Sequence, residues 1–240
     1  MKSVSTLVYG CLLSVFLLTA QGFAQESTPM PDSAQHQEAE REIKQQERQR
    51  VLGIVPEFNV TNLQNATKLS PGQKFRLAFR SATDPFTFVA AGLDAGINQW
   101  EDDFPGYGQG AEGYGKRFGA SYADSFSGTI LGNAFFPVLF HQDPRYFRKG
   151  TGSIKSRILY AALSTFRAKG DNGKWQPNFS NLLGNLAAGG IANLYYPQSD
   201  RGATLTIQRG ITVSLEGALG ALGVEFWPDV ARKLRRNRTP

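Results

Sequence analysis

The stretch His141-Gln142-Asp143-Pro144-Arg145-Tyr146-Phe147-Arg148 places a dense group of polar side chains between two apolar parts of the chain. It holds the only histidine of the predicted folded region, with a carboxylate, two arginines and a tyrosine close by. The most apolar segment, residues 127–140, precedes it, and a predicted helix follows it. We therefore expect residues 141–148 to hold the fold together.

The residue types in this stretch allow two interpretations. The first is a structural hub formed by Asp143 and Tyr146, in which the carboxylate caps backbone N–H groups and pairs with an arginine. The second is a binding site for a phosphate, a sulfate or a lipid headgroup, with its positive charge supplied by His141, Arg145, Arg148 and Lys149. We favour the hub and keep the anion site as a secondary possibility.

An enzyme centred on His141, either a hydrolase or an anion-binding enzyme, is the alternative to a non-enzymatic protein. A serine hydrolase needs a nucleophile, a base and an orienting acid, and no nucleophile motif accompanies this histidine. His36 is the only other histidine, so we predict no metal site. Residues 108–113 match G-x-G-x-x-G, but an acidic stretch precedes them where a buried strand is required, so we predict no cofactor.

The N-terminus has the pattern of a secretory signal peptide over residues 1–24. Lys2 precedes an apolar run, and small residues lead to a cleavage position after Ala24. Cys11 is the only cysteine and would leave with this segment, so we predict neither disulfides nor thiolate sites. The protein is expected to be exported to the periplasm or cell envelope, with membrane association as a further possibility.

The rest of the chain divides by composition into three regions. Residues 25–69 are predicted to be a polar, disordered linker because they lack an apolar stripe. Residues 70–230 are predicted to form one helical domain, and residues 231–240 a basic tail that could contact anionic lipid. The net charge is +6 and becomes +5 without Lys2. Because an exported protein rarely meets nucleic acid, we exclude that partner.

Helix signals recur through residues 70–230. A polar cap followed by proline begins helices at Ser70 and Asp84. Apolar spacing predicts helices at residues 85–100, 116–126, 127–140, 153–169 and 178–195. Residues 204–226 fit a strand or a helix, and we favour the helix because no partner strand is evident. The expected fold is mainly α, a compact bundle of about six glycine-rich helices.

Small residues recur at short spacings within these helices. Gly92 and Gly96 lie four apart, as do Gly128 and Gly132, and a spacing of three continues near residue 220. Each glycine inside a helix costs about 1 kcal/mol relative to alanine. We therefore predict close approach of helices, a device that membrane proteins use often. Because the apolar runs are short and interrupted, we favour a peripheral or soluble bundle over a spanning one.

Several motifs together resemble an uncharacterised family of exported bacterial cell-envelope proteins. They are KFRLAFR (74–80), DPFTF (84–88), YGQGAEGY (107–114), HQDPRYF (141–147), KGDNG (169–173) and NLYYP (193–197). Some members of that family carry the domain behind a carboxypeptidase-regulatory-like module. The resemblance implies a single helical envelope domain and no assigned activity. We therefore expect a non-enzymatic exported protein that contacts membrane or another envelope component.

Overall fold

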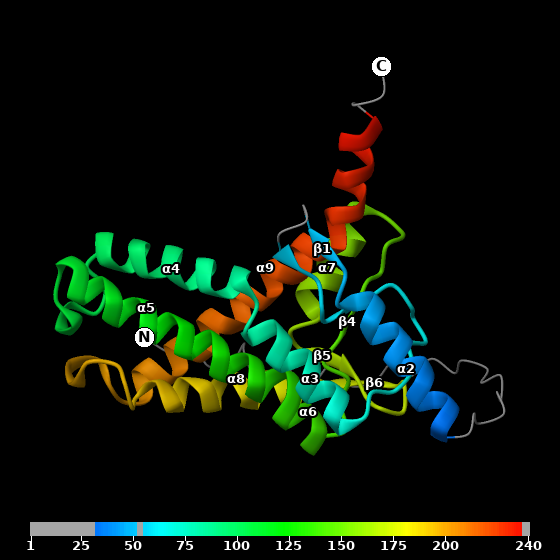
Figure 1. Ribbon diagram of the computed structural model, residues 1–240, viewed down its shortest axis with the longest axis horizontal. Coiled ribbons are helices and arrows are strands. Elements are labelled where there is room, and N and C mark those ends of the chain that lie inside the picture. The colour runs from blue at the N-terminus through cyan, green and yellow to red at the C-terminus, as the bar shows by residue number, and fades with distance from the viewer. Residues whose placement is uncertain (1–31, 52–54, 237–240) are drawn as a thin grey trace, which may run out of the picture. The chain divides into compact units, whose positions relative to one another are not determined.

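The computed structural model describes residues 32–51 and 55–236, so the predicted signal peptide at residues 1–24 lies outside the described part. Here the fold is mainly α, as predicted (Figure 1). The α-helices are α2 (Asp32–Gln46), α3 (Pro71–Ala82), α4 (Pro85–Trp100), α5 (Gly110–Ile130), α6 (Phe136–Leu139), α7 (Ile154–Leu163), α8 (Phe179–Ala192) and α9 (Ala203–Arg236). A π-helical turn, Leu131–Phe135, joins α5 to α6, and 3-10 turns lie at Pro105–Tyr107 and Gln198–Asp200.

Helices α4, α5, α8 and α9 lie side by side, and we call them the four-helix bundle (Figure 1). Helix α4 packs on α5, α5 on α8, and α8 on α9. One apolar cluster joins α2 to α3 and consists of Ala39, Ile43, Phe58, Leu69 and Leu77. A second cluster lies within the bundle and consists of Tyr107, Ala120, Ala192, Tyr196 and Leu205.

The starts of α3 and α4 follow from local sequence, as predicted. The Ser70 hydroxyl accepts a hydrogen bond from the Gln73 backbone N–H, and the Gln73 side chain accepts one from the Ser70 N–H. This reciprocal capping box satisfies two N–H groups that have no partner within the helix. The Asp84 carboxylate caps α4 by accepting from the Phe86 N–H, and it pairs with Arg50 at 2.6 Å.

The folded unit begins at Asp32 and not near Ser70, which corrects the predicted boundary of the linker. Helix α2 buries Ile43 against its neighbours and buries the carboxylate of Glu42 beside it. That carboxylate accepts hydrogen bonds from the backbone N–H and the hydroxyl of Thr67, both at 3.0 Å. Polar contacts therefore share in holding this segment to the domain, so it does not need a wide apolar stripe.

Three two-stranded sheets form a second difference from prediction. They are β1 (Arg50–Val51) with β2 (Val55–Pro56), β3 (Val60–Thr61) with β4 (Tyr146–Phe147), and β5 (Arg167–Lys169) with β6 (Trp175–Pro177). The helix predicted over 153–169 therefore ends at Leu163. The chain is extended after it because Lys169 accepts a hydrogen bond from the Asp143 N–H at 2.8 Å. A turn precedes β6, with Gly173 at a φ of 74°.

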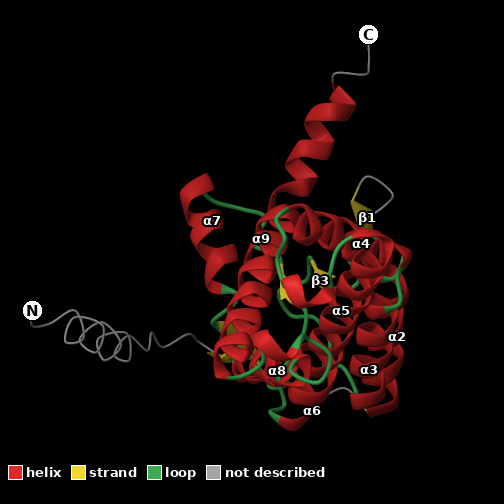
Figure 2. Ribbon diagram, turned by 90° about the vertical axis from the view of Figure 1, so that its left-hand side faces the viewer, coloured by secondary structure: helices red, strands yellow, loops and turns green. Residues whose placement is uncertain are grey.

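Helix α9 confirms the helical interpretation of residues 204–226. Its first part packs on α8, and it also packs on α7, which lies beside it in Figure 2. The helix continues through Pro228 to Arg236. Residues 231–236 of the predicted basic tail are therefore helical.

The close approach predicted from glycine spacing occurs at two contacts of α8. A Cβ atom on Gly184 would lie 2.7 Å from the Cα of Gly132, and one on Gly189 would clash with the Thr206 carbonyl oxygen. Other glycines of the bundle meet no neighbour within 4 Å, among them Gly96, Gly115, Gly119, Gly217, Gly220 and Gly223. Close packing therefore explains only part of the glycine content.

Two adjacent glycines of α8 provide a direct test of this packing. Gly189→Ala is expected to lower the free energy of unfolding by about 1–3 kcal/mol, because the added methyl group meets the backbone of α9. Gly190→Ala has open space and should raise it by about 1 kcal/mol through helix propensity. Thermal unfolding followed by circular dichroism measures both. Equal changes in melting temperature for the two variants would contradict the close contact between Gly189 and α9.

Candidate functional site

The stretch 141–148 connects parts of the chain that are distant in sequence. Its strand β4 pairs in parallel with β3, while Gln142 forms a bridge with Gly170 on the opposite side. The Gln142 side chain also accepts hydrogen bonds from the backbone N–H and hydroxyl of Ser180, at the start of α8. This single stretch thereby fixes the N-terminal segment, the β5–β6 hairpin and the bundle relative to one another.

Asp143 and Arg145 form the buried centre of this hub. The Asp143 carboxylate accepts from the Arg145 backbone N–H at 2.9 Å and pairs with its guanidinium at 2.7 Å. The same guanidinium pairs with Glu42 of α2 at 2.9 Å. A buried charge is tolerated when it is paired and hydrogen-bonded in this way. With two carboxylates already on it, Arg145 is poorly placed to bind an external anion.

The other residues of the predicted anion site do not converge. Arg148 is buried and pairs with Glu57 at 2.7 Å. The Lys149 ammonium donates to the Ser156 hydroxyl. His141 is exposed in a left-handed turn with a φ of 52°, and it lines neither of the two cavities that Asp143 lines. The arrangement therefore favours the hub over an anion site or an enzyme centred on His141.

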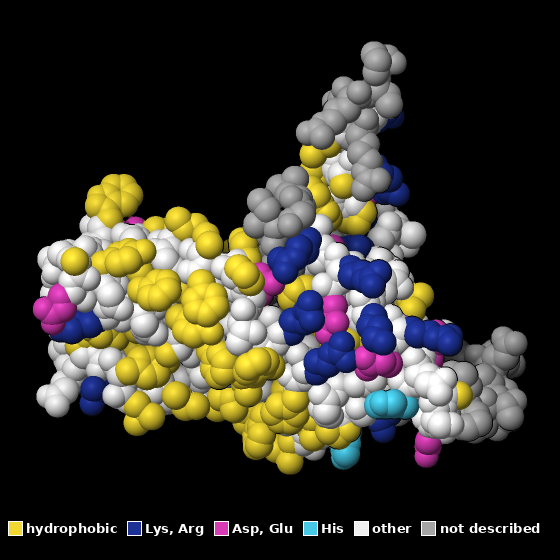
Figure 3. Space-filling view, viewed as in Figure 1, with side chains coloured by type: hydrophobic (Ala, Val, Ile, Leu, Met, Phe, Trp, Pro, Cys, Tyr) yellow, Lys and Arg dark blue, Asp and Glu magenta, His cyan; other side chains and the backbone are white. Residues whose placement is uncertain are grey.

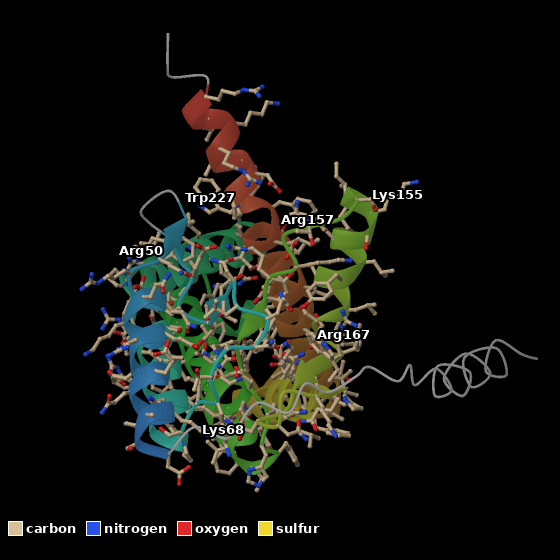
Figure 4. The ribbon with its side chains drawn as sticks, turned by 90° about the vertical axis from the view of Figure 1, so that its right-hand side faces the viewer. Arg50, Lys68, Lys155, Arg157, Arg167 and Trp227 are labelled. Carbon is tan, nitrogen blue, oxygen red and sulfur yellow. The ribbon has the colours of Figure 1, made fainter. Side chains whose placement is uncertain are left out.

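A further buried carboxylate, Glu225 of α9, completes the hub. It is 0% exposed and accepts hydrogen bonds from the Tyr146 hydroxyl at 2.8 Å and from the Lys149 and Gly150 N–H groups at 2.9 Å. Arg157, which Figure 4 shows on α7 beside α9, pairs with it at 2.8 Å. The sequence analysis missed Glu225, although a lone carboxylate among small and apolar residues was a signal for burial.

The inside of the four-helix bundle holds charged and polar groups beside its apolar cluster. Asp124 of α5 pairs with Arg209 of α9 at 2.7 Å and accepts hydrogen bonds from the Tyr195 and Tyr196 hydroxyls. Burial raises the pKa of both phenols, and the Asp124 carboxylate raises it further. The two hydroxyls therefore stay protonated and act as donors.

Asp94 extends this polar interior towards α4. Its carboxylate accepts hydrogen bonds from the Ser121 hydroxyl and, at 2.9 Å, from the Asn98 side chain. The charge of Asp94 within an otherwise apolar helix was visible in the sequence, where it argued against a membrane span. In the fold, the Asp94 side chain points toward α5, where it contacts Ser121.

The outside of the bundle is apolar. Large exposed apolar side chains lie on α4 (Phe88, Val89, Leu93, Ile97, Trp100), on α8 (Leu182, Leu183, Leu186, Ile191), in the turn after it (Leu194) and on α9 (Ile207, Ile211, Leu215, Leu219). Figure 3 shows hydrophobic side chains gathered over the bundle, whereas lysines and arginines gather over the part that contains α2 and α3. Among the helices at residues 32–51 and 55–236, none combines the length and apolar character required to cross a membrane.

Comparison of the chain with protein-family models, curated proteins and solved structures gives no match.

Proposed function

We propose that the protein is a non-enzymatic, exported component of the cell envelope that contacts a lipid membrane through the outside of its four-helix bundle. The observation that carries this proposal is the apolar exterior of α4, α8 and α9 around an interior that contains the Asp124–Arg209 ion pair. Export is supported by the signal-peptide pattern of residues 1–24.

The physical argument rests on the cost of exposed apolar surface. Soluble monomers rarely expose contiguous apolar patches beyond a few hundred Å², and larger ones mark sites of contact with proteins or membranes. Charged residues that face the bundle interior, with apolar residues outside, are typical of helices in contact with lipid. Helix α4 has 16 residues and is about 24 Å long, less than the roughly 30 Å of a hydrocarbon core. The proposed contact is therefore a partial insertion.

A charged substitution on α4 tests this membrane contact. Leu93 is 66% exposed, so Leu93→Glu should leave stability within about 0.5 kcal/mol. It should reduce co-flotation with phospholipid vesicles by about ten-fold or more, because a carboxylate resists transfer into hydrocarbon. Leu63→Glu is the matched control, since Leu63 is 51% exposed and lies outside the bundle. Flotation of Leu93→Glu at the wild-type level would overturn the proposal.

Salt separates this contact from a purely electrostatic one. Apolar insertion should persist at high ionic strength, whereas attraction of the basic residues 232–238 to anionic headgroups should be screened. Release of the wild type by salt would assign the contact to the C-terminal end of α9 and not to the bundle. Failure of the wild type to float on any vesicle would instead favour another envelope component as the partner.

A further inference from the structure

Two neighbouring cavities extend from the four-helix bundle to the hub. The first has a volume of about 440 Å³ and lies among α4, α5, α8 and α9. The second, of about 590 Å³, lies among α7, α9, the β5–β6 hairpin and residues 143–147. Both volumes are in the range of small-molecule sites. The cavities share the wall residues Gly132, Asn133, Asn181 and Gly217, so they adjoin one another.

The first cavity carries an excess of negative charge. Its charged lining residues are Asp94, Asp124, Arg209 and Glu216. Arg209 is paired with Asp124 at 2.7 Å, and no other cation of the described residues forms an ion pair with Asp94 or Glu216. Nor do three His, Cys, Asp or Glu side chains of the described ranges converge to hold a metal ion. The excess charge therefore suits an organic cation.

The second cavity is mainly apolar and has open space along α9. Its aromatic walls are Tyr146, Phe147, Tyr160, Trp175 and Trp227, the last labelled on α9 in Figure 4. Gly217, Gly220 and Gly223 line it from one helix, and a Cβ atom on any of them would meet nothing within 4 Å. These glycines do not serve close packing. All three are exposed, so their absent side chains leave the mouth of the cavity open to solvent, at about 1 kcal/mol each in helix propensity.

The charged groups of the second cavity are already engaged. Arg145 is paired with Asp143. The Arg167 guanidinium lies 4.7 Å from the ring centroids of both Tyr160 and Trp175, as a cation–π contact. The remaining apolar walls suit a hydrocarbon or aromatic group. The two cavities thus differ in chemistry, with one acidic and one apolar.

We propose that the adjoining cavities bind one cationic amphiphile, with its ammonium group beside Asp94 and Glu216 and its apolar body against the aromatic walls of the second cavity. The charge complementarity is specific to a cation, and the glycines of α9 leave space for the apolar part. Glu216 and the glycines of α9 are exposed, so this site is a groove open to solvent, and its lining residues differ from the apolar side chains of the bundle exterior.

Tryptophan fluorescence tests the site in the whole protein. Trp175 and Trp227 line the second cavity, and Trp100 is 88% exposed on α4, so Trp100→Phe removes the signal from the exterior. In this background, dodecyltrimethylammonium below its micellar concentration should bind about ten-fold more tightly than dodecyl sulfate. Glu216→Gln should weaken binding of the cation by about ten-fold and leave binding of the anion unchanged or stronger. A preference for dodecyl sulfate would overturn the assignment.

A pair of glycine variants separates the cavity from the exterior. Gly220→Leu fills the second cavity and should abolish the fluorescence change, while its melting temperature stays equal to or above that of the parent. Gly119 lies on an exposed site of α5 with no neighbour within 4 Å. Gly119→Leu should therefore gain the same helix propensity and still bind dodecyltrimethylammonium. If Gly220→Leu and Glu216→Gln both bind like the parent, the site is refuted. Vesicle flotation should be unaffected by Gly220→Leu, which keeps this test independent of the proposed membrane contact.

Discussion

Replacing Arg145 by methionine is expected to lower the free energy of unfolding by about 3–5 kcal/mol. The guanidinium is fully buried and neutralises the carboxylates of Asp143 and Glu42. Methionine retains much of the apolar volume but leaves both carboxylates buried without a cation, which is the costly way to break an ion pair. Urea unfolding followed by circular dichroism, with linear extrapolation to water, measures the loss.

Arg76 provides the matched control. It also contacts two carboxylates, Glu40 and Glu47, but its side chain is 42% exposed. Exposed ion pairs contribute about 0–1 kcal/mol, so Arg76→Met should change the unfolding free energy by less than about 1 kcal/mol. If the Arg145 and Arg76 variants lose the same free energy of unfolding, burial does not determine how much the hub stabilises the fold, and our interpretation of the hub is wrong.

Local signals in the sequence were sufficient for much of the helical architecture. Ser70 and Asp84 cap their helices through neighbours two or three residues away, so the sequence itself contains both partners. Asp143 likewise caps the N–H of Arg145, two residues on. These features need no knowledge of the rest of the fold, because short-range hydrogen bonds decide them.

Long-range partners could not be derived in this way. Arg145 meets Glu42 across 103 residues, and Tyr146 meets Glu225 across 79. Periodicity does not identify such pairs, so α2 was assigned to a linker on its polar composition. The bundle interior was missed for the same reason, because Asp124 and Arg209 are indistinguishable in sequence from surface charges until α5 and α9 are brought together.

Glu225→Gln is expected to lower the free energy of unfolding by about 3–5 kcal/mol at pH 7. The residue is 0% exposed, and its carboxylate accepts from the side chains of Arg157 and Tyr146 and from two backbone N–H groups. An amide presents one NH₂ group toward these donors and has no charge to balance the guanidinium. Unfolding in urea at pH 7, compared with the wild type, gives the size of the loss.

The pH dependence of that loss identifies the charge as its cause. Burial alone would raise the pKa of Glu225, but hydrogen bonds from Arg157 and Tyr146 outweigh it and lower the pKa below the ordinary 4.5. A carboxyl with a lowered pKa in the folded state contributes its full stability above the unfolded value, and this is lost as the pH falls through the folded value. The difference between wild type and Glu225→Gln should therefore be largest near pH 7 and shrink below pH 4.5.

Glu216, on the same helix, should behave in the opposite way. Desolvation raises the pKa of Glu216, and the nearby Asp94 carboxylate adds to that effect. Its ionised form is therefore disfavoured by folding, and Glu216→Gln should slightly raise stability at pH 7. If Glu225→Gln lowers the free energy of unfolding by the same amount at every pH, the shape of the side chain and not its charge holds α9 to the hub. A loss that disappears in acid, together with a gain in Glu216→Gln, would show that the Glu225 carboxylate stabilises the fold and that the Glu216 carboxylate destabilises it.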